Sequence, residues 1–300
     1  MHRVPSPSGS EGWAERVATL AHAALIDELE TWPKPGLVSL VDSGSHDDMD
    51  AGTLRCSAAA IRPFFADLAA AGARGAAMAE LRAIGIRAEA AMMRATGGVN
   101  AHRGAIFSLG LICAAAGVSG AAPASAEAHA VAVGELWGPA IAGAPASPMS
   151  HGGRVARRYG VGGAAAEAAA GFPTIRDIGL PALRLGRTRA PDDPEAARVE
   201  CFFALLAVLD DTNLLHRGGA DGLAVARASA GAFRAAGGVA TPGWRDRAAR
   251  IHHDFVAARL SPGGCADLLA ATLLLDALAA PGPPADTVAF PRGRALPTCG

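Results

Sequence analysis

Apolar side chains recur along this chain at the spacing of α-helices, and few segments alternate as strands do. Leu54, Ile61 and Leu68 repeat every seven residues, and Ala58 and Phe65 fall between them. An apolar seam of this kind marks one face of an amphipathic helix. The chain is also rich in Ala and Leu and poor in aromatic residues (5%). We therefore predict an all-α fold, a single compact multi-helix domain whose glycine-rich loops form one cleft.

The same pattern places further helices along the chain and a loose segment at each end. Residues 1–12 form a Pro/Ser/Gly arm that we predict to be disordered, the helical domain spans 13–280, and 281–300 form a loose tail. An irregular connection is expected over 174–194. The other helices are predicted at about 13–31, 76–95, 104–117, 126–137, 199–209, 222–236, 243–260 and 261–278.

Charge and cysteine usage limit the class of protein. The net charge is −1, so no overall field attracts nucleic acid or an anionic membrane. The charge-free run 104–126 contains glycines and Pro123, so we expect a buried helix there and no membrane span. The five cysteines are scattered singly, and the N-terminus lacks the apolar region of a signal peptide. These features predict reduced thiols in a cytoplasmic protein.

The most polar stretch runs from Trp32 to Asp50 and reads WPKPGLVSLVDSGSHDDMD. Only 18% of all residues are charged, against roughly 25% in ordinary globular proteins, so this density of carboxylates needs a reason. Carboxylates beside His46 are oxygen ligands of the kind that Mg²⁺ takes together with substrate phosphates. The alternative is a solvated acidic loop, and this stretch alone does not exclude it.

Residue types that are rare in this chain fall in polar, glycine-bearing segments. Lys34 is the only lysine and lies between two prolines, while Asn100 and Asn213 are the only side-chain amides. A lysine retained among arginines suggests a site that needs a compact ammonium. Asn100, in TGGVNAHRG, is placed to cap the next helix, whose first N–H groups suit an anion, with Lys34 or Arg103 supplying charge.

Carboxylates also follow a predicted buried helix at 199–209. Asp210 and Asp211 come at its end, where negative charge opposes the helix dipole, so we expect a compensating metal ion or arginine. In SPGGCADLLA we predict Ser261 as the cap of the last helix, with Asp267 in an early turn, where an acid is favourable.

A basic block follows His151 and contains Arg154, Arg157 and Arg158. These arginines could hold phosphates, and a solvated basic face is the equally good alternative.

Four blocks together resemble the signature of a known family. PKPGLVSLVDSGSHDDMD, TGGVNAHRGAIFSLGL, DDTNLLHRGG and SPGGCADLLA are similar to the conserved blocks of the triphosphoribosyl-dephospho-CoA synthases, in the same order, and cover about 30–278. By this resemblance the protein is all-helical, uses Mg²⁺, and joins ATP to 3′-dephospho-CoA with release of adenine.

The resemblance also implies a place for the product. That product is the precursor of the prosthetic group on the acyl-carrier subunit of citrate lyase or malonate decarboxylase, so a transferase acting on that subunit would receive it. Arg103 stands where citrate-type members often have lysine, in TGGVNTHKG, and this favours the malonate decarboxylase branch. A homodimer is an open alternative for the assembly.

Family and residue chemistry together suggest roles for single residues. We expect Asp48, Asp50, Glu89 and Asp211 to bind Mg²⁺ and the triphosphate, and we expect His46 or a nearby carboxylate to be the base, so that the catalytic set is His46, Asp48, Glu89 and Asp211. Lys34, Arg103 and Arg217 would contact phosphate oxygens, and Asn100, Asn213 and Asp267 would orient the substrate or the ligating carboxylates. The full set expected to bind the nucleotide is Lys34, Ser45, Gly97, Gly98, Asn100, His102, Arg103, Asn213, Arg217 and Asp267.

Two other functions fit parts of the sequence. His46-Asp47 and His252-His253-Asp254 suggest an HD-type metal-dependent nucleotide phosphohydrolase, which needs several histidines around its metal. A non-enzymatic helical adaptor could use the acidic loop as a docking surface. Neither gives a role to the glycine blocks or to the lysine between two prolines.

Overall fold

The computed structural model describes residues 7–144 and 151–280. In these residues it contains α-helices, one π-helix and one 3-10 helix, and no strand, which confirms the all-α prediction. In chain order they are α1 (Pro7–Glu30), α2 (Ala51–Ala73), α3 (Met78–Ala95), α4 (Arg103–Ser119), α5 (Ala126–Ala142), α6 (His151–Tyr159), α7 (Gly163–Ala169), η1 (Ile175–Gly179), α8 (Leu180–Arg189), α9 (Pro194–Leu206), α10 (Thr212–Ala235), η2 (Gly238–Ala240), α11 (Trp244–Ala257) and α12 (Gly263–Ala279).

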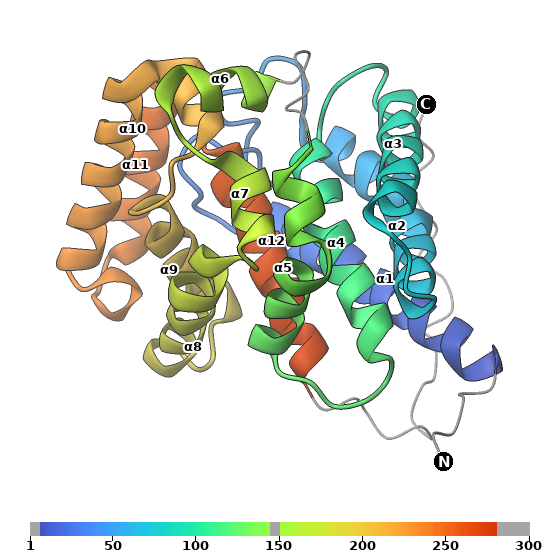
Figure 1. Ribbon diagram of the computed structural model, residues 1–300. Coiled ribbons are helices and arrows are strands. Elements are labelled where there is room, and N and C mark those ends of the chain that lie inside the picture. The colour runs from blue at the N-terminus through green and yellow to red at the C-terminus, as the bar shows by residue number, and fades with distance from the viewer. Residues whose placement is uncertain (1–6, 145–150, 281–300) are drawn as a thin grey trace.

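Helix α12 runs through the middle of the molecule. Every residue from Leu268 to Leu275 is buried, as expected of a helix that is apolar all round. It contacts α1 and α4 on one side and α9 and α10 on the other. Figure 1 shows α1, α2 and α3 on one flank of α12 and α8 to α11 on the opposite flank. The first turns of α12 therefore lie between the two halves of the fold.

Helices α2 and α4 cross at two small residues. A Cβ atom at Gly72 would lie 1.9 Å from the carbonyl oxygen of Ala114, and one at Gly117 would lie 1.9 Å from that of Ala69. The two backbones therefore touch directly. This close contact lies in the last turns of α4 and fixes the position of that helix, whose first turn carries part of the site described below.

The predicted apolar seam is confirmed. Leu54, Ala58, Ile61, Phe65 and Leu68 are all buried on α2.

Several boundaries differ from the sequence prediction. Helix α1 begins at Pro7 instead of residue 13, while the rest of the expected arm (1–6) and the expected tail (281–300) lie outside the described residues. The prediction of an irregular connection over 174–194 is wrong, because η1 and α8 occupy most of this segment. Ile175, Leu180 and Leu183 are buried there. Their apolar contacts outweigh the Arg and Pro content that suggested a loop.

Helix α10 is longer than predicted. It begins at Thr212, and a kink at Gly219 (φ 63°, ψ −160°) separates its first two turns from the part expected over 222–236. Glycine adopts this backbone conformation readily. The DDTNLLHRGG block is thus the start of a helix and not a loop after one.

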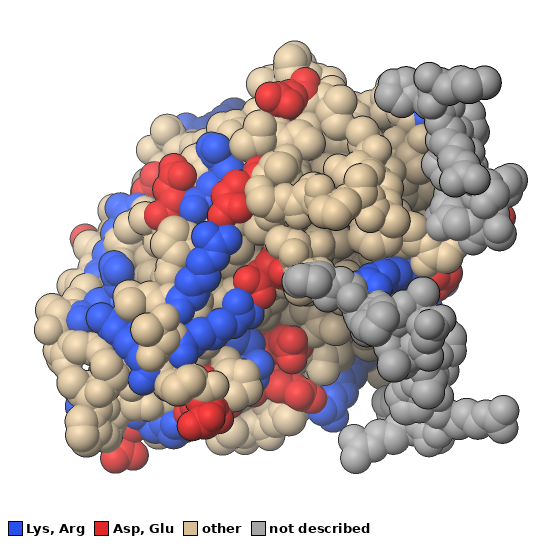
Figure 2. All heavy atoms as spheres, turned by 90° about the horizontal axis from the view of Figure 1, so that it is seen from below, with Lys and Arg blue, Asp and Glu red and all other residues tan. Residues whose placement is uncertain are grey.

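The surface carries basic and acidic side chains close together, as Figure 2 shows for the face seen from below. Ion pairs such as Arg187–Asp276 (2.5 Å) and Arg184–Glu127 (2.8 Å) account for part of this mixture. Among the helices that the structure describes, none is long and apolar enough to cross a lipid bilayer. Cys113, Cys201 and Cys265 are free and buried, as expected of reduced thiols, whereas Cys56 is disulfide-bonded and departs from that expectation.

Candidate functional site

The starts of α10 and α12 are joined by one buried carboxylate. Asp211, which is 1% exposed, accepts hydrogen bonds at Oδ1 from the backbone N–H groups of Asn213 (2.8 Å) and Leu214 (3.2 Å). Its Oδ2 accepts another from the N–H of Cys265 (2.8 Å). Burial raises the pKa of Asp211, and these bonds oppose the rise. Asp211 therefore caps α10 and does not end α9, so the unfavourable dipole contact inferred from the sequence is wrong.

The start of α4 lies next to the starts of α10 and α12, because Asp267 on α12 contacts its first residues. A Cβ atom at Gly104 would lie 1.9 Å from Asp267 Oδ2, so glycine is required there for the carboxylate to reach α4. Asp267 keeps partial exposure to solvent. Its pKa is raised well above the usual value by burial, by the charge of Asp211 and by the charge of Glu28, and a hydrogen bond from the N–H of Ala105 opposes this. Three helix starts and two carboxylates thus converge.

Lys34 is fully buried and lies near Asp267 and the start of α4. Its ammonium donates hydrogen bonds to the carboxylate and the backbone carbonyl of Glu28, the last buried acid of α1. Burial lowers the pKa of Lys34, and the charge of Glu28 opposes the change. The peptide between Trp32 and Pro33 is cis. The predicted lysine site therefore contains a buried ion pair, and Glu28, its partner, was missed in the sequence analysis.

His102 completes the set from the start of α4. Its Nδ1 lies 2.6 Å from the hydroxyl of Ser57 on α2, and the ring is 6% exposed. Burial, followed by the charges of Lys34 and His22, lowers the pKa of His102 to about 4. The imidazole is therefore neutral at neutral pH. We refer to Glu28, Lys34, Ser57, His102, Asp211 and Asp267 as the polar centre.

A second network lies beside the polar centre and includes His46. The Nε2 atom of His46 is 2.9 Å from the hydroxyl of Ser261, which precedes α12. An Nη2 atom of Arg217 is 3.2 Å from His46 Nδ1, and Asp48 Oδ1 is 3.5 Å from the same atom. Burial and then Arg217 lower the pKa of His46, while Asp48 raises it. With Arg217 donating to Nδ1, the neutral ring carries its proton on Nε2, and Ser261 accepts it.

Ser45 and Arg217 bind this network to the residues that follow α11. The hydroxyl of Ser45 donates to the carbonyl of Leu260 (2.6 Å), and Arg217 donates to the carbonyls of Ser45 (2.9 Å) and Arg259 (3.3 Å). Ser261, predicted as the cap of α12, is instead bound to His46, and Pro262 holds the cap position.

The TGGVNAHRG turn lies at the outer edge of the site. Gly97 and Gly98 are exposed and have positive φ angles (63° and 97°), which end α3. Asn100 Oδ1 accepts a hydrogen bond from the N–H of Arg103 at 3.3 Å, close to the capping role expected of it, although the cap position itself belongs to His102. Arg103 Nε donates to Glu89 Oε2 at 3.0 Å.

The carboxylates expected to bind Mg²⁺ are not gathered at one point. Asp48 has a 64% exposed side chain, Asp50 caps α2 by accepting from the N–H of Thr53 (2.8 Å), and Glu89 is paired with Arg103. Within the described ranges, no three His, Cys, Asp or Glu side chains are grouped to hold a metal ion. Any metal there would need ligands from a substrate as well.

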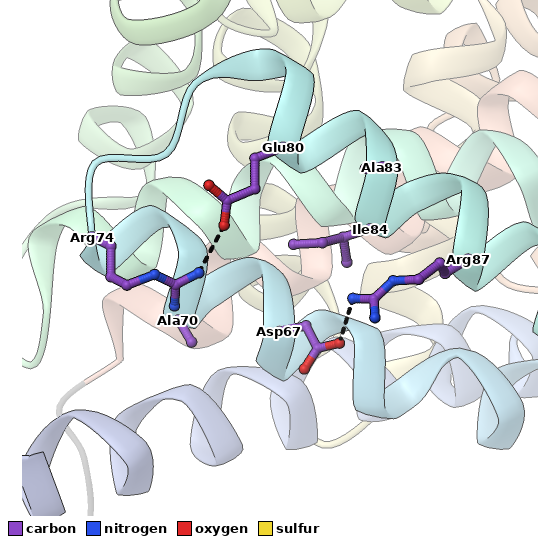
Figure 3. Close-up of a pocket in the computed structure, with 7 residues that line it drawn as sticks. All are labelled: Asp67, Ala70, Arg74, Glu80, Ala83, Ile84 and Arg87. Atoms are coloured by element: carbon purple, nitrogen blue, oxygen red, sulfur yellow. Dashed lines mark hydrogen bonds and ion pairs between the residues drawn. The ribbon is translucent and has the colours of Figure 1, made fainter.

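A depression of about 400 Å³ lies elsewhere, between α2 and α3. Figure 3 shows its walls, in which Arg74 pairs with Glu80 (2.8 Å) and Arg87 with Asp67 (3.1 Å) around Ile84. None of the predicted site residues lines it. The candidate site is therefore defined by the convergence of helix starts and not by this depression.

Among the histidines of the HD-type alternative, His252 has a structural role. The rings of His252 and Trp32 are 4.5 Å apart, and His252 donates from Nδ1 to the carbonyl of Lys34 (2.9 Å). Its Nε2 lies 3.1 Å from Asp42. His252 thus holds the loop after α1 in place, and within the described residues it belongs to no group of three His, Cys, Asp or Glu side chains that could hold a metal ion.

Several known proteins are similar to this chain along most of its length. A sequence model of the ATP:dephospho-CoA triphosphoribosyl transferase family matches residues 14–284. A Stutzerimonas stutzeri protein named probable 2-(5''-triphosphoribosyl)-3'-dephosphocoenzyme-A synthase is 46% identical over 88% of this chain and 92% of its own length. Relatives with the same name from Pseudomonas paraeruginosa and Azotobacter vinelandii are 45% and 42% identical, over 89% and 92% of this chain and 92% and 94% of theirs. No solved structure gives a significant match.

Proposed function

Since this chain belongs to the ATP:dephospho-CoA triphosphoribosyl transferase family, we propose that it joins ATP to 3′-dephospho-CoA, with release of adenine, at the polar centre and the His46 network. The observation that carries the proposal is the convergence of α4, α10 and α12 at Asp211 and Asp267. Backbone N–H groups at helix starts and the positive ends of their dipoles favour phosphate groups.

A divalent cation fits this place if it arrives with the triphosphate. Asp267 is a partly exposed carboxylate whose pKa is raised by burial and by the charges of Asp211 and Glu28. Such crowding of negative charge is relieved by a cation, and Mg²⁺ commonly takes one or two carboxylates plus phosphates. Asp211 already accepts three backbone hydrogen bonds, so Asp267 is the better ligand. Mg²⁺ there would neutralise the charge of the triphosphate.

The reaction transfers a ribosyl group. The bond between C1′ of the ATP ribose and N9 of adenine breaks, and the 2′-hydroxyl oxygen of dephospho-CoA forms a bond to C1′. The hydroxyl proton must be accepted, and adenine leaves carrying a proton in its place. Since C1′ becomes positive in the transition state, as in glycoside transfer, nearby carboxylates stabilise it.

His46 is the proposed proton acceptor. Burial and Arg217 lower its pKa, so its ring is neutral at neutral pH and can take a proton. Asp48, 3.5 Å from Nδ1, would stabilise the protonated form. Arg217, Arg103 and the start of α4 remain the proposed phosphate contacts. Lys34 would act on the triphosphate only if it leaves Glu28, so in this conformation we assign it to holding the loop.

The finer assignment to a pathway rests on Arg103 within TGGVNAHRG, which favours malonate decarboxylase over citrate lyase. The product would then pass to a transferase acting on the acyl-carrier subunit, in the cytoplasm.

Mass spectrometry tests the proposal. Purified protein with ATP, MgCl₂ and 3′-dephospho-CoA should give free adenine and a product whose mass is the sum of both substrates less adenine. Release of inorganic phosphate without adenine would instead support the phosphohydrolase. Absence of both products, with no stabilisation of the protein by ATP and Mg²⁺, would support the adaptor; a ligand at 100 times its Kd should add about 2.7 kcal/mol.

A further inference from the structure

The residue that follows the C-cap of helix α11 is an arginine in a backbone conformation that favours glycine. Arg259 comes directly after the C-cap Ala258 and has a φ angle of 54°. Its own N–H binds the carbonyl of Val256 (3.0 Å), and the N–H of Leu260 binds that of Phe255 (2.9 Å), which is the hydrogen-bond pattern of a Schellman turn. A Cβ atom is strained in this conformation, so glycine is the usual residue there.

Other helices of the same chain do end with glycine at this position. Helices α2, α3, α7 and α10 are each followed by a glycine of positive φ, namely Gly75, Gly97, Gly171 and Gly237. Among these helix ends Arg259 is the exception. Its ion pair with Asp47 (2.9 Å) does not explain the exception, because both side chains are largely exposed (74% and 79%) and exposed pairs add little stability. A side chain retained against backbone strain points to a binding role.

The contacts of Arg259 direct it to the His46 network. Its carbonyl accepts a hydrogen bond from Arg217 (3.3 Å), whose guanidinium also lies 3.2 Å from Nδ1 of His46. Its own guanidinium donates to Asp47, the residue next to His46. Burial lowers the pKa of Arg217, the charge of Asp48 opposes the change, and the charge of Arg259 adds to it. Arg217 and Arg259 therefore place two positive charges beside Nδ1 of His46.

The other nitrogen of the His46 ring is bound to the residues before α12. Its Nε2 lies 2.9 Å from the hydroxyl of Ser261, and α12 continues from there to the N–H of Cys265 that binds Asp211. In the neutral ring Nε2 carries the proton, so Nδ1 is the atom that can accept one. The reacting hydroxyl must therefore approach His46 from the side of the two arginines, while the polar centre is reached through α12.

The arginine side suits the diphosphate of the acceptor. In 3′-dephospho-CoA the diphosphate is attached to C5′ of the ribose whose 2′-hydroxyl reacts, so the two groups bind close together. A diphosphate without metal is bound best by guanidinium groups, which form two parallel hydrogen bonds. It can replace Asp47 on Arg259, since an exposed ion pair is weak. It also gives Arg217 a new acceptor when the hydroxyl takes its place at Nδ1.

We propose that Arg259, together with Arg217, binds the diphosphate of dephospho-CoA in exchange for Asp47, and thereby places the 2′-hydroxyl of the acceptor at Nδ1 of His46. This inference rests on the proposed function. It divides the site into a carboxylate side for ATP and Mg²⁺ and an arginine side for the acceptor, with the base between them.

Arg259→Gly in the full-length protein is the direct test, because glycine fits this backbone conformation and the variant should fold at least as stably as the unaltered protein. It should weaken the binding of 3′-dephospho-CoA about tenfold by titration calorimetry without ATP, since it removes a charge-assisted contact. Affinity for ATP with Mg²⁺ should stay within about twofold, because carboxylates and helix starts hold that ligand. Arg259→Lys keeps the charge without the two parallel bonds and should lose less.

Asp47→Asn should have the opposite effect. It removes the carboxylate that competes for Arg259, so dephospho-CoA should bind about threefold more tightly. Most of this gain should vanish in the double variant with Arg259→Gly, because the two residues act on the same contact. The exposed pair Arg87–Asp67 (3.1 Å), at the depression between α2 and α3, gives matched controls. Arg87→Ala and Asp67→Asn should leave the affinity for dephospho-CoA unchanged.

Steady-state kinetics provide the second measurement. At saturating ATP and Mg²⁺, Arg259→Gly should raise KM for dephospho-CoA about tenfold, with kcat for adenine release within about twofold, as expected for lost substrate binding. Unchanged binding and KM in this variant, weaker binding by Asp47→Asn, or a loss confined to ATP would each overturn the proposal and leave the proposed function standing. If the unaltered protein binds dephospho-CoA but releases no adenine, the proposed function fails, and the binding comparison still decides the role of Arg259.

Discussion

Asp211 Oδ2 accepts a hydrogen bond from the backbone N–H of Cys265 at 2.8 Å, so a single carboxylate joins the start of α10 to the start of α12. This contact links two sequence blocks that are far apart in the chain. It gives Asp211 a structural role that is independent of any chemistry it performs.

Asp211→Ala should destabilise the fold by about 2–4 kcal/mol, because it removes a helix cap and leaves a buried N–H of Cys265 without a partner. Asp211→Asn keeps one side-chain oxygen to cap α10, so its loss of unfolding free energy should be smaller. Urea unfolding of both variants measures the difference. If Asp211→Asn is stable yet releases no adenine, the negative charge itself is needed, whereas normal turnover would leave Asp211 with the structural role alone.

Asp267→Asn should stabilise the ligand-free protein at pH 7 while greatly reducing its affinity for ATP and Mg²⁺. The folded-state pKa of Asp267 is raised, so the folded chain holds this proton more tightly than the unfolded chain. Stability from this group is complete below the unfolded pKa of about 3.9 and is lost as the pH rises through the folded pKa. The gain from asparagine should therefore be present at pH 7 and disappear towards pH 3.5.

Thermal unfolding at both pH values, with and without ATP and Mg²⁺, checks this. Asp276→Asn, near the other end of α12, serves as a control that should not change ATP binding. A destabilised Asp267→Asn protein at pH 7 would contradict the electrostatic argument.

The sequence predicts those parts of the fold and of the candidate site whose pattern lies within one short segment of the chain. Leu54, Ile61 and Leu68 repeat within one helix, so their seven-residue spacing alone was enough to predict the buried face of α2. Asp211 was assigned to the wrong helix, because a carboxylate between two apolar runs can end one helix or cap the next, and only packing decides. The glycines in TGGVNAHRG marked the end of α3 correctly.

The missed residues share a different cause. Glu28 lies in an acidic helix end, DELE, where nothing in the sequence distinguishes it from the half-buried acids Asp27 and Glu30. Only the need of Lys34 for a counter-charge would have indicated it. Ser57 lies among apolar residues of one helix in the sequence, and nothing there indicates that its hydroxyl forms a hydrogen bond with His102. Partners distant in sequence leave no periodic trace, so pairs such as these require the fold. The roles in binding and catalysis remain predictions.

His46 should set the acid side of the pH–activity profile. Its pKa is lowered by burial and by Arg217, so kcat/KM should be constant near neutral pH and fall only below the ordinary histidine value of about 6.5. Arg217→Ala removes a positive neighbour and should move the midpoint to higher pH. Asp48→Asn removes a negative one and should move it to lower pH, with a severe fall in turnover. Midpoints that shift in the same direction, or not at all, would remove His46 from the role of base.

Lys34 and Glu28 should behave as a pair. Lys34→Met leaves the carboxylate of Glu28, which is 7% exposed, buried without its counter-charge, and should cost about 3–5 kcal/mol of unfolding free energy. The double variant Lys34→Met with Glu28→Leu removes both charges and should recover most of this loss, as replacement of buried ion pairs by apolar side chains often does. Urea titration of both single variants and the double variant gives the coupling energy. If the double variant is as stable as expected, its activity also shows whether the Lys34 ammonium takes part in the reaction, which an unstable single variant cannot show. Normal adenine release would restrict Lys34 to positioning the loop, whereas loss of release in a stable protein would mean that the ammonium leaves Glu28 to contact the triphosphate.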